Sequence, residues 1–112
     1  MAALPRAIQP VSARFLAALR ARFGARLTEC IVFGSWARGD ATEDSDLDVF
    51  VVVDELTDAE RREIAEMAYD VDSVEHDLHG LSPLAYSTSQ AAELRARGRR
   101  LFADIVRDGI AL

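Results

Sequence analysis

Two short apolar segments predict the core strands of this chain. Leu27–Phe33 ends in three β-favouring residues in a row and stops at Gly34. Leu47–Val53 is the stronger signal, because its last five residues are all apolar. Such a continuous run is typical of a central strand that is buried on both faces. We therefore expect a sheet built around these two segments, with a polar stretch between them.

Helical periodicity flanks the two strands. Apolar residues recur at helical spacing over residues 10–23, and Gly24 is a suitable stop. Thr57 followed by Glu60 matches a capping box and opens a second helix. Both helices are expected to turn one apolar side to the sheet. The inner face of the second helix is formed by Ile64, Met67, Ala68 and Val71.

A third, weaker strand is predicted over residues 73–78, where Glu75 and Asp77 interrupt the apolar alternation. Further on, Ser82-Pro83 indicates a helix start with proline at the first helical position. A final helix is predicted over residues 91–107.

Glycines set the limits of this last helix, because Gly98 can break it in two and Gly109 ends it. The predicted order is helix, strand, turn, strand, helix, strand, helix. A chain of 112 residues is one domain. Residues 1–112 are therefore expected to form a single α/β (α+β) domain, a small mixed β-sheet flanked by helices.

Composition removes several classes of function. The net charge of −6 argues against direct nucleic-acid binding, because general nucleic-acid binders work by neutralising phosphates. All thirteen basic residues are arginine, which excludes a Walker A loop and a pyridoxal Schiff base, since both need lysine. Cys30 is the single cysteine, as expected in a reducing cytoplasm. No apolar run is long enough for a bilayer, so we expect a cytoplasmic protein without membrane contact.

The polar stretch between the two strands carries the candidate chemistry. Gly34 lets a ligand approach the backbone, and Ser35 opens a helical turn whose hydroxyl and N–H groups suit a phosphate. Asp46 and Asp48 lie two residues apart on a strand, so their side chains point to the same face. Two such carboxylates repel each other unless a divalent cation lies between them, and Mg²⁺ prefers these oxygen ligands. A phosphate site beside a magnesium ligand pair is what nucleotidyl transfer needs.

Either half of this pattern is common alone, whereas two acids that open an otherwise apolar strand cost stability unless they are paired.

The segment resembles a known family. Gly34-Ser35, ten residues and then Asp46-x-Asp48 resembles the G-S-x10-D-x-D motif of the DNA polymerase β-like nucleotidyltransferase superfamily. The fuller string FGSWARGDATEDSDLDVFV and the ending FADIVRDGIAL are similar to its MNT branch, the minimal nucleotidyltransferases. The resemblance implies the polymerase β-like fold, with Ser35 binding the nucleotide triphosphate and Asp46 and Asp48 holding two Mg²⁺ ions.

The resemblance also implies a third carboxylate on a later strand, which shares the metals and helps to deprotonate the acceptor hydroxyl. Asp77 is the first choice, as a catalytic residue and metal ligand beside Asp46 and Asp48. Glu75 is the rival, because two-residue alternation places it on one face with Asp77 and His79.

Other polar residues stay open between binding and structural roles. Arg38 either reaches a phosphate from the short helix or caps local carbonyls. The basic stretch at residues 95–100 (RARGRR) is a solvated helix face or a docking patch for an acidic partner or RNA. His76 and His79 are more typical of surface or hydrogen-bonded strand positions than of catalysts, and Trp36 is expected to be a packing residue.

By resemblance, the leading hypothesis is Mg²⁺-dependent transfer of AMP from ATP to a hydroxyl of a partner protein. MNT proteins are typically paired with a helical HEPN protein as antitoxin and toxin, and the MNT member adenylylates a tyrosine of its partner. The short chain leaves no room for a second domain, so a HEPN-type partner or a second copy, in a homodimer or hetero-oligomer, is expected to complete the pocket. The alternatives are a non-catalytic antitoxin that acts by binding, and a nucleotidyltransferase acting on a small molecule.

Overall fold

The computed structural model describes residues 3–75 and 80–112, and the strands in these ranges form a four-stranded mixed sheet. Its strand order is β3-β2-β1-β4. The pairs β1–β2 and β1–β4 are antiparallel, whereas β2–β3 is parallel. The expected α/β (α+β) class with a small mixed sheet is confirmed. The strands are β1 (Leu27–Phe33), β2 (Leu47–Val53), β3 (Leu81–Ser87) and β4 (Ile110–Ala111).

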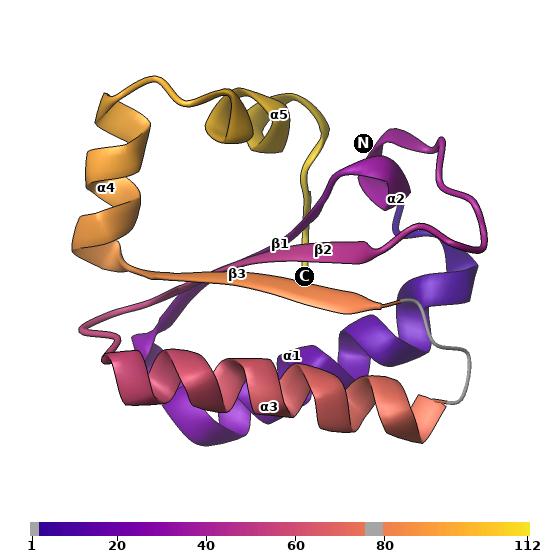
Figure 1. Cartoon of the computed structure of the whole chain (residues 1–112), viewed down its shortest axis with the longest axis horizontal. Coiled ribbons are helices and arrows are strands. Elements are labelled where there is room, and N and C mark those ends of the chain that lie inside the picture. The colour runs from indigo at the N-terminus through magenta and orange to yellow at the C-terminus, as the bar shows by residue number, and fades with distance from the viewer. Residues whose placement is uncertain (1–2, 76–79) are drawn as a thin grey trace.

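Helices lie on both faces of the sheet (Figure 1). In that view α1 (Gln9–Phe23) and α3 (Asp58–Glu75) cover the lower face, while α4 (Thr88–Ala96) and α5 (Arg100–Asp108) lie on the upper face. A single helical turn, α2 (Ser35–Arg38), follows β1. Within the described ranges, no helix combines the length and apolar character that crossing a membrane requires. Short 3-10 turns flank α1 at Arg6–Ile8 and Gly24–Arg26.

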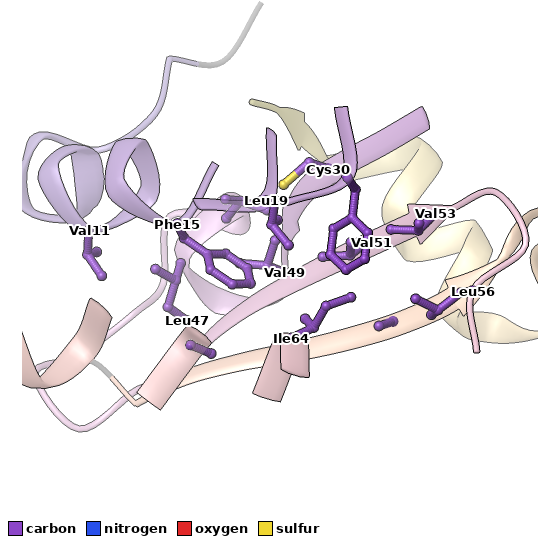
Figure 2. Close-up of a cluster of buried hydrophobic side chains, with 14 of the residues drawn as sticks. Val11, Phe15, Leu19, Cys30, Leu47, Val49, Val51, Val53, Leu56 and Ile64 are labelled. Atoms are coloured by element: carbon purple, nitrogen blue, oxygen red, sulfur yellow. The ribbon is translucent and has the colours of Figure 1, made fainter. Parts of the chain in front are cut away.

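The main core lies between the sheet and the layer of α1 and α3 (Figure 2). Alternate residues of β2 point into it, because successive side chains of a strand face opposite sides. Phe15 and Leu19 of α1 and Ile64 of α3 are fully buried against them. The β2 residues of this core are Leu47, Val49, Val51 and Val53.

A second, smaller cluster covers the upper face of the sheet. Phe50 of β2 is fully buried and meets Phe102 of α5 edge-on, with the ring centres 5.4 Å apart. Tyr86 of β3 contacts Phe50 from the side, with the ring centres 6.0 Å apart. Both faces of β2 are therefore buried, as its continuous apolar run predicts.

The strand predicted over residues 73–78 is wrong for residues 73–75, which are helical. The helix α3 continues through Glu75, and residues 76–79 lie outside the described part of the chain. The strand that pairs with β2 is β3, which begins at Leu81. Ser82-Pro83 is therefore not a helix start. Pro83 is tolerated because β3 lies at the edge of the sheet, where a missing N–H need not break a ladder hydrogen bond.

The helices after β3 follow capping and glycine signals. Ser87 and Gln90 form a reciprocal capping box, in which Gln90 N donates to Ser87 Oγ at 3.2 Å and Ser87 N donates to Gln90 Oε1 at 2.9 Å. The predicted helix over residues 91–107 is two helices, and the break at Gly98, with φ +65°, is confirmed. The two-residue strand β4 was not predicted, because so short a segment has no periodicity to detect.

An ion-pair network at Glu60 ties α3 to the 3-10 turn that precedes β1. Arg26 Nη1 and Nη2 donate to the two carboxylate oxygens of Glu60 at 2.8 and 2.9 Å. The expected capping box is also formed, since Thr57 N donates to Glu60 Oε1 at 3.0 Å and Glu60 N to Thr57 Oγ1 at 3.1 Å. These hydrogen bonds, led by those from Arg26, lower the pKa of Glu60 from 4.5 to about 2. The ionised form of Glu60 therefore stabilises the native state.

We predict that Glu60→Gln lowers the free energy of unfolding at neutral pH, because an ionised group with a lowered native pKa stabilises the fold above its unfolded pKa. That contribution is complete above pH 4.5 and is lost as the pH falls through about 2. The difference in unfolding free energy between variant and wild type therefore shrinks over this pH range. Urea unfolding across the pH range measures it. Glu66→Gln, an exposed site on the same helix, is the control and should show no comparable pH-dependent loss.

Candidate functional site

The turn after β1 has a backbone conformation that favours glycine. Gly34 has φ +78° and ψ −153°, a region essentially restricted to glycine. Its carbonyl accepts hydrogen bonds from the N–H groups of Ala37 at 3.1 Å and Arg38 at 3.0 Å, which start α2. Ser35 is the first residue of this helical turn and is half-buried. The predicted strand–turn–helix arrangement at Gly34-Ser35 is confirmed.

The register of β1 and β2 brings Asp48 to this turn. Asp48 pairs with Phe33, the last residue of β1. A Cβ atom at Gly34 would lie 2.5 Å from Oδ2 of Asp48, closer than real Cβ atoms approach their neighbours. Gly34 is thus required both for its backbone angles and for the space that the carboxylate of Asp48 occupies.

Asp46 lies at the same end of the sheet, immediately before β2. A Cβ atom at Gly80 would clash with Oδ1 of Asp46, and Gly80 has a left-handed φ of +63°. The N–H of Leu47 donates to the carbonyl of Gly80 at 3.2 Å, which ties the chain after Asp46 to the residue before β3. Each aspartate is therefore packed against a glycine, and the two glycines come from different segments.

The two carboxylates are electrostatically coupled. Burial, followed by the negative charge of Asp46, raises the pKa of Asp48, and the positive charge of Arg38 opposes this. Asp48 is half-buried while Asp46 is exposed, so the pair is open to solvent on one side. Repulsion between neighbouring carboxylates favours binding of a cation.

The donor set suits a hard divalent cation that brings other ligands with it. Mg²⁺ is commonly bound through one or two carboxylates and keeps water or substrate phosphate in its remaining positions. Among residues 3–75 and 80–112, no group of three or more His, Cys, Asp or Glu side chains could hold a metal ion. Asp46 and Asp48 therefore fit a site in which water and phosphate oxygens complete the shell.

The predicted third carboxylate is not located. Asp77 lies outside the described residues, together with His76 and His79. Glu75 is the last residue of the helix α3, so the prediction that it shares a strand face with Asp77 and His79 is wrong.

The strand beside β2 has a hydroxyl where an acid was expected. The sequence of β3, LSPLAYS, contains no carboxylate, and Ser82 is the residue that pairs with Asp48. Because paired residues of neighbouring strands point to the same face, Ser82 lies beside Asp48 on the upper side of the sheet.

The arginines divide between the site and the fold. Arg38 is exposed at the end of α2, and its Nε lies 3.4 Å from Oδ2 of Asp40. Arg95, the first residue of the basic stretch, is structural, because its Nη2 donates to Oε1 of Glu29 at 2.6 Å. The guanidinium of Arg95 also stacks 5.2 Å from the ring centre of Phe102. The basic stretch is therefore not uniformly a solvated face.

Two contacts at the site lie beyond what the sequence reveals. Trp36 packs against the main core, as predicted, but its indole N–H also donates to the carbonyl of Ser45 at 3.1 Å. Gly80 backs Asp46 across a gap of many residues. The sequence signal for this contact is only that Gly80 follows a polar segment, and many turns have such a glycine.

We predict that Gly34→Ala both destabilises the fold and weakens binding of a divalent cation, because the new Cβ displaces Asp48. Gly24→Ala is the matched control, since Gly24 has φ +55° and ψ −130° but open space around it. Each variant should lose about 1–3 kcal/mol of unfolding free energy from backbone strain. Mn²⁺ binding, followed by electron paramagnetic resonance, should weaken in Gly34→Ala alone; equal binding by both variants would contradict the contact with Asp48.

We also predict that Asp48→Asn stabilises the metal-free protein at neutral pH. A carboxyl whose native pKa is raised binds protons more tightly in the folded state, so its ionisation destabilises the fold as the pH rises past the ordinary value of 3.8. The gain in stability should be present at neutral pH and disappear below pH 3.8. Thermal unfolding in EDTA measures it, and added Mg²⁺ should stabilise the wild type more than the variant. If Asp48→Asn is less stable than the wild type in EDTA, burial and repulsion by Asp46 do not determine the effect of the Asp48 charge on stability.

Known proteins are similar to this chain in sequence. The nucleotidyltransferase domain family matches residues 12–98. A putative protein adenylyltransferase of Methanocaldococcus jannaschii is 48% identical over 40 residues, which is 36% of this chain and 40% of that protein. The protein adenylyltransferase MntA of Thermococcus cleftensis is 55% identical over 38 residues, 34% of this chain and 36% of that protein. The matched segments thus cover less than half of either relative.

A solved structure shares the fold. The crystal structure of a toxin-antitoxin with AMP-PNP superimposes with a TM-score of 0.51 at 19% sequence identity, covering 87% of this chain and 68% of that chain. At this identity the likeness concerns the fold. The family match, by contrast, spans most of the chain and includes the segment from Gly34 to Asp48, so the chain belongs to the nucleotidyltransferase domain family.

Proposed function

We propose that this nucleotidyltransferase domain transfers AMP from ATP to a hydroxyl group of a partner protein. One observation carries the proposal, the convergence of the Gly34-Ser35 turn with Asp46 and Asp48 at one end of the β1–β2 pair. A phosphate-binding turn in contact with a carboxylate pair suits a nucleoside triphosphate with a divalent cation.

Each residue has a role that its position supports. Ser35 and the N–H groups at the start of α2 would bind the triphosphate, and Arg38 would neutralise phosphate charge from the end of the same turn. Asp46 and Asp48 would hold Mg²⁺, which supplies charge neutralisation at the phosphates and orients them for displacement. Asp77 is proposed as the third carboxylate, because it precedes Gly80 by three residues and Gly80 lies against Asp46.

The reaction is an in-line displacement at the α-phosphorus of ATP. The acceptor hydroxyl oxygen forms a bond to this phosphorus, and the bond to the bridging oxygen breaks, so pyrophosphate leaves. The hydroxyl proton passes to a carboxylate, for which Asp77 is the candidate. Catalysis of this kind depends mainly on positioning and charge stabilisation, which the rigid end of the β1–β2 pair favours.

A protein acceptor is favoured over a small molecule by the relatives. Both sequence relatives are named protein adenylyltransferases, and the structural neighbour is a toxin-antitoxin. Together with the resemblance to MNT proteins, this supports a HEPN-type toxin as the partner and a tyrosine hydroxyl as the acceptor. The partner, or a second copy of the chain, would contribute residues to the pocket.

A second candidate is an antitoxin that neutralises its partner by binding alone. The observation that favours it is the absence of any carboxylate from the sequence of β3, where Ser82 pairs with Asp48. In this alternative the site binds nucleotide and cation without an effective proton acceptor, and the partner is silenced by occlusion.

Transfer of label from α-³²P-ATP to the HEPN-type protein purified with the chain tests the proposal. We predict Mg²⁺-dependent labelling that falls by about 100-fold or more in Asp46→Asn and in Asp48→Asn, because the metal contributes several kcal/mol of charge stabilisation. Asp70→Asn, an exposed change on α3, is the control and should label normally.

The two candidates give different results in the same assay. Labelling that needs both aspartates supports transfer, and mass spectrometry then identifies the acceptor residue. Suppression of the partner's toxicity without any label, and without dependence on either aspartate, would overturn transfer and support the binding antitoxin.

A further inference from the structure

The loop between α2 and β2 determines where Asp46 lies. It runs from Gly39 to Asp46 at the edge of the site and has no regular secondary structure. An exposed loop of this kind is expected to be mobile unless side chains tie it down. A metal ligand at its end would then be poorly positioned, so the contacts that hold the loop bear directly on the site.

The loop is closed on itself by a small hydrogen-bonded turn next to Asp46. Ser45 N donates to the carbonyl of Thr42 at 3.1 Å, and Thr42 N donates to Oγ of Ser45 at 2.8 Å. The hydroxyls of Thr42 and Ser45 lie 3.3 Å apart. The chain immediately before Asp46 is therefore folded into a compact unit.

Trp36 anchors this unit to the core. Its indole N–H donates to the carbonyl of Ser45 at 3.1 Å, and its ring packs against the main core beneath the sheet. On the other side of Asp46, the hydrogen bond from Leu47 N to the Gly80 carbonyl holds the start of β2. Asp46 is thus fixed between two backbone attachments, one of which depends on a single side chain.

We propose that Trp36 is a positioning residue that sets the affinity of the Asp46–Asp48 pair for a divalent cation, by holding Ser45 and hence Asp46 in place. The proposal rests on the metal-binding role of the two aspartates in the proposed function. Groups that orient metal ligands typically contribute 10–100-fold in affinity or activity. Trp36 contacts Ser45, one residue before the proposed metal ligand Asp46, and acts through the backbone. We therefore expect an effect of about 10-fold on the affinity for the cation.

Trp36→Phe separates the hydrogen bond from the packing, because phenylalanine keeps an aromatic ring in the core but has no N–H. Thr28→Val is the matched control. Thr28 Oγ1 donates to the carbonyl of Val52 at 3.3 Å, a side-chain-to-backbone hydrogen bond of the same kind at the opposite end of β1. Losing either bond should lower the stability by a similar, small amount.

The first measurement is binding of Mn²⁺ alone, by electron paramagnetic resonance, to wild type, Trp36→Phe, Thr28→Val and Asp46→Asn. We expect binding that is about 10-fold weaker in Trp36→Phe, unchanged in Thr28→Val and abolished or weaker still in Asp46→Asn. Wild-type affinity in Trp36→Phe, with loss in Asp46→Asn, would overturn the proposal and leave the proposed function standing. Wild-type affinity in Asp46→Asn would instead overturn the metal site itself.

Two further measurements guard against a variant that folds poorly. Ser45→Ala keeps the carbonyl that Trp36 contacts but removes the acceptor for Thr42 N, so it should weaken Mn²⁺ binding in the same direction. In the labelling assay, Trp36→Phe should raise the Mg²⁺ concentration needed for half-maximal transfer, with the maximal rate recovered at saturating Mg²⁺. A general loss of structure would lower the maximal rate, and that result would contradict a positioning role.

Discussion

The antiparallel pairing of β1 with β2 is the constraint on which the site depends. It places Phe33 opposite Asp48. The turn that follows β1 therefore lies next to the carboxylate of Asp48, near the start of β2. A register shifted by one residue would turn Asp48 toward the main core and Val49, Val51 and Val53 toward the upper side. The buried apolar residues of β2 therefore hold the site together as well as the core, since they penalise any other register.

The same alternation assigns the two faces of the sheet different tasks. The lower face, covered by α1 and α3, is continuous core from Leu47 to Val53. On the upper face, Phe102 of α5 packs on Phe50. Asp48, two residues earlier in β2, is half-buried. A single strand thus provides some of the most buried side chains and a carboxylate that reaches solvent. The rigidity of the first supports the geometry of the second.

The site also concentrates features that are unfavourable for folding alone. Gly34 adopts a conformation that most residues avoid, and both burial and the negative charge of Asp46 disfavour the ionised form of Asp48 by raising its pKa. Such features persist where the surrounding structure over-determines them and a ligand compensates them. They lie at one end of the β1–β2 pair, whereas the Arg26–Glu60 ion pairs join α3 to the turn before β1 at the other end. The proposed binding site is therefore separate from these stabilising ion pairs.

Sequence patterns alone predict the two core strands and the helices around residues 10–23 and after Thr57. They also predict that a Gly-Ser turn and the carboxylates of Asp46 and Asp48 form one site. These are local signals, since strand alternation, capping boxes and glycine requirements act over a few residues. Only the tertiary structure decided that residues 73–75 end a helix, that Ser82-Pro83 enters the edge strand and that Trp36 and Gly80 hold Asp46. Such outcomes depend on which segments pack side by side, and a short ambiguous run takes its conformation from that packing.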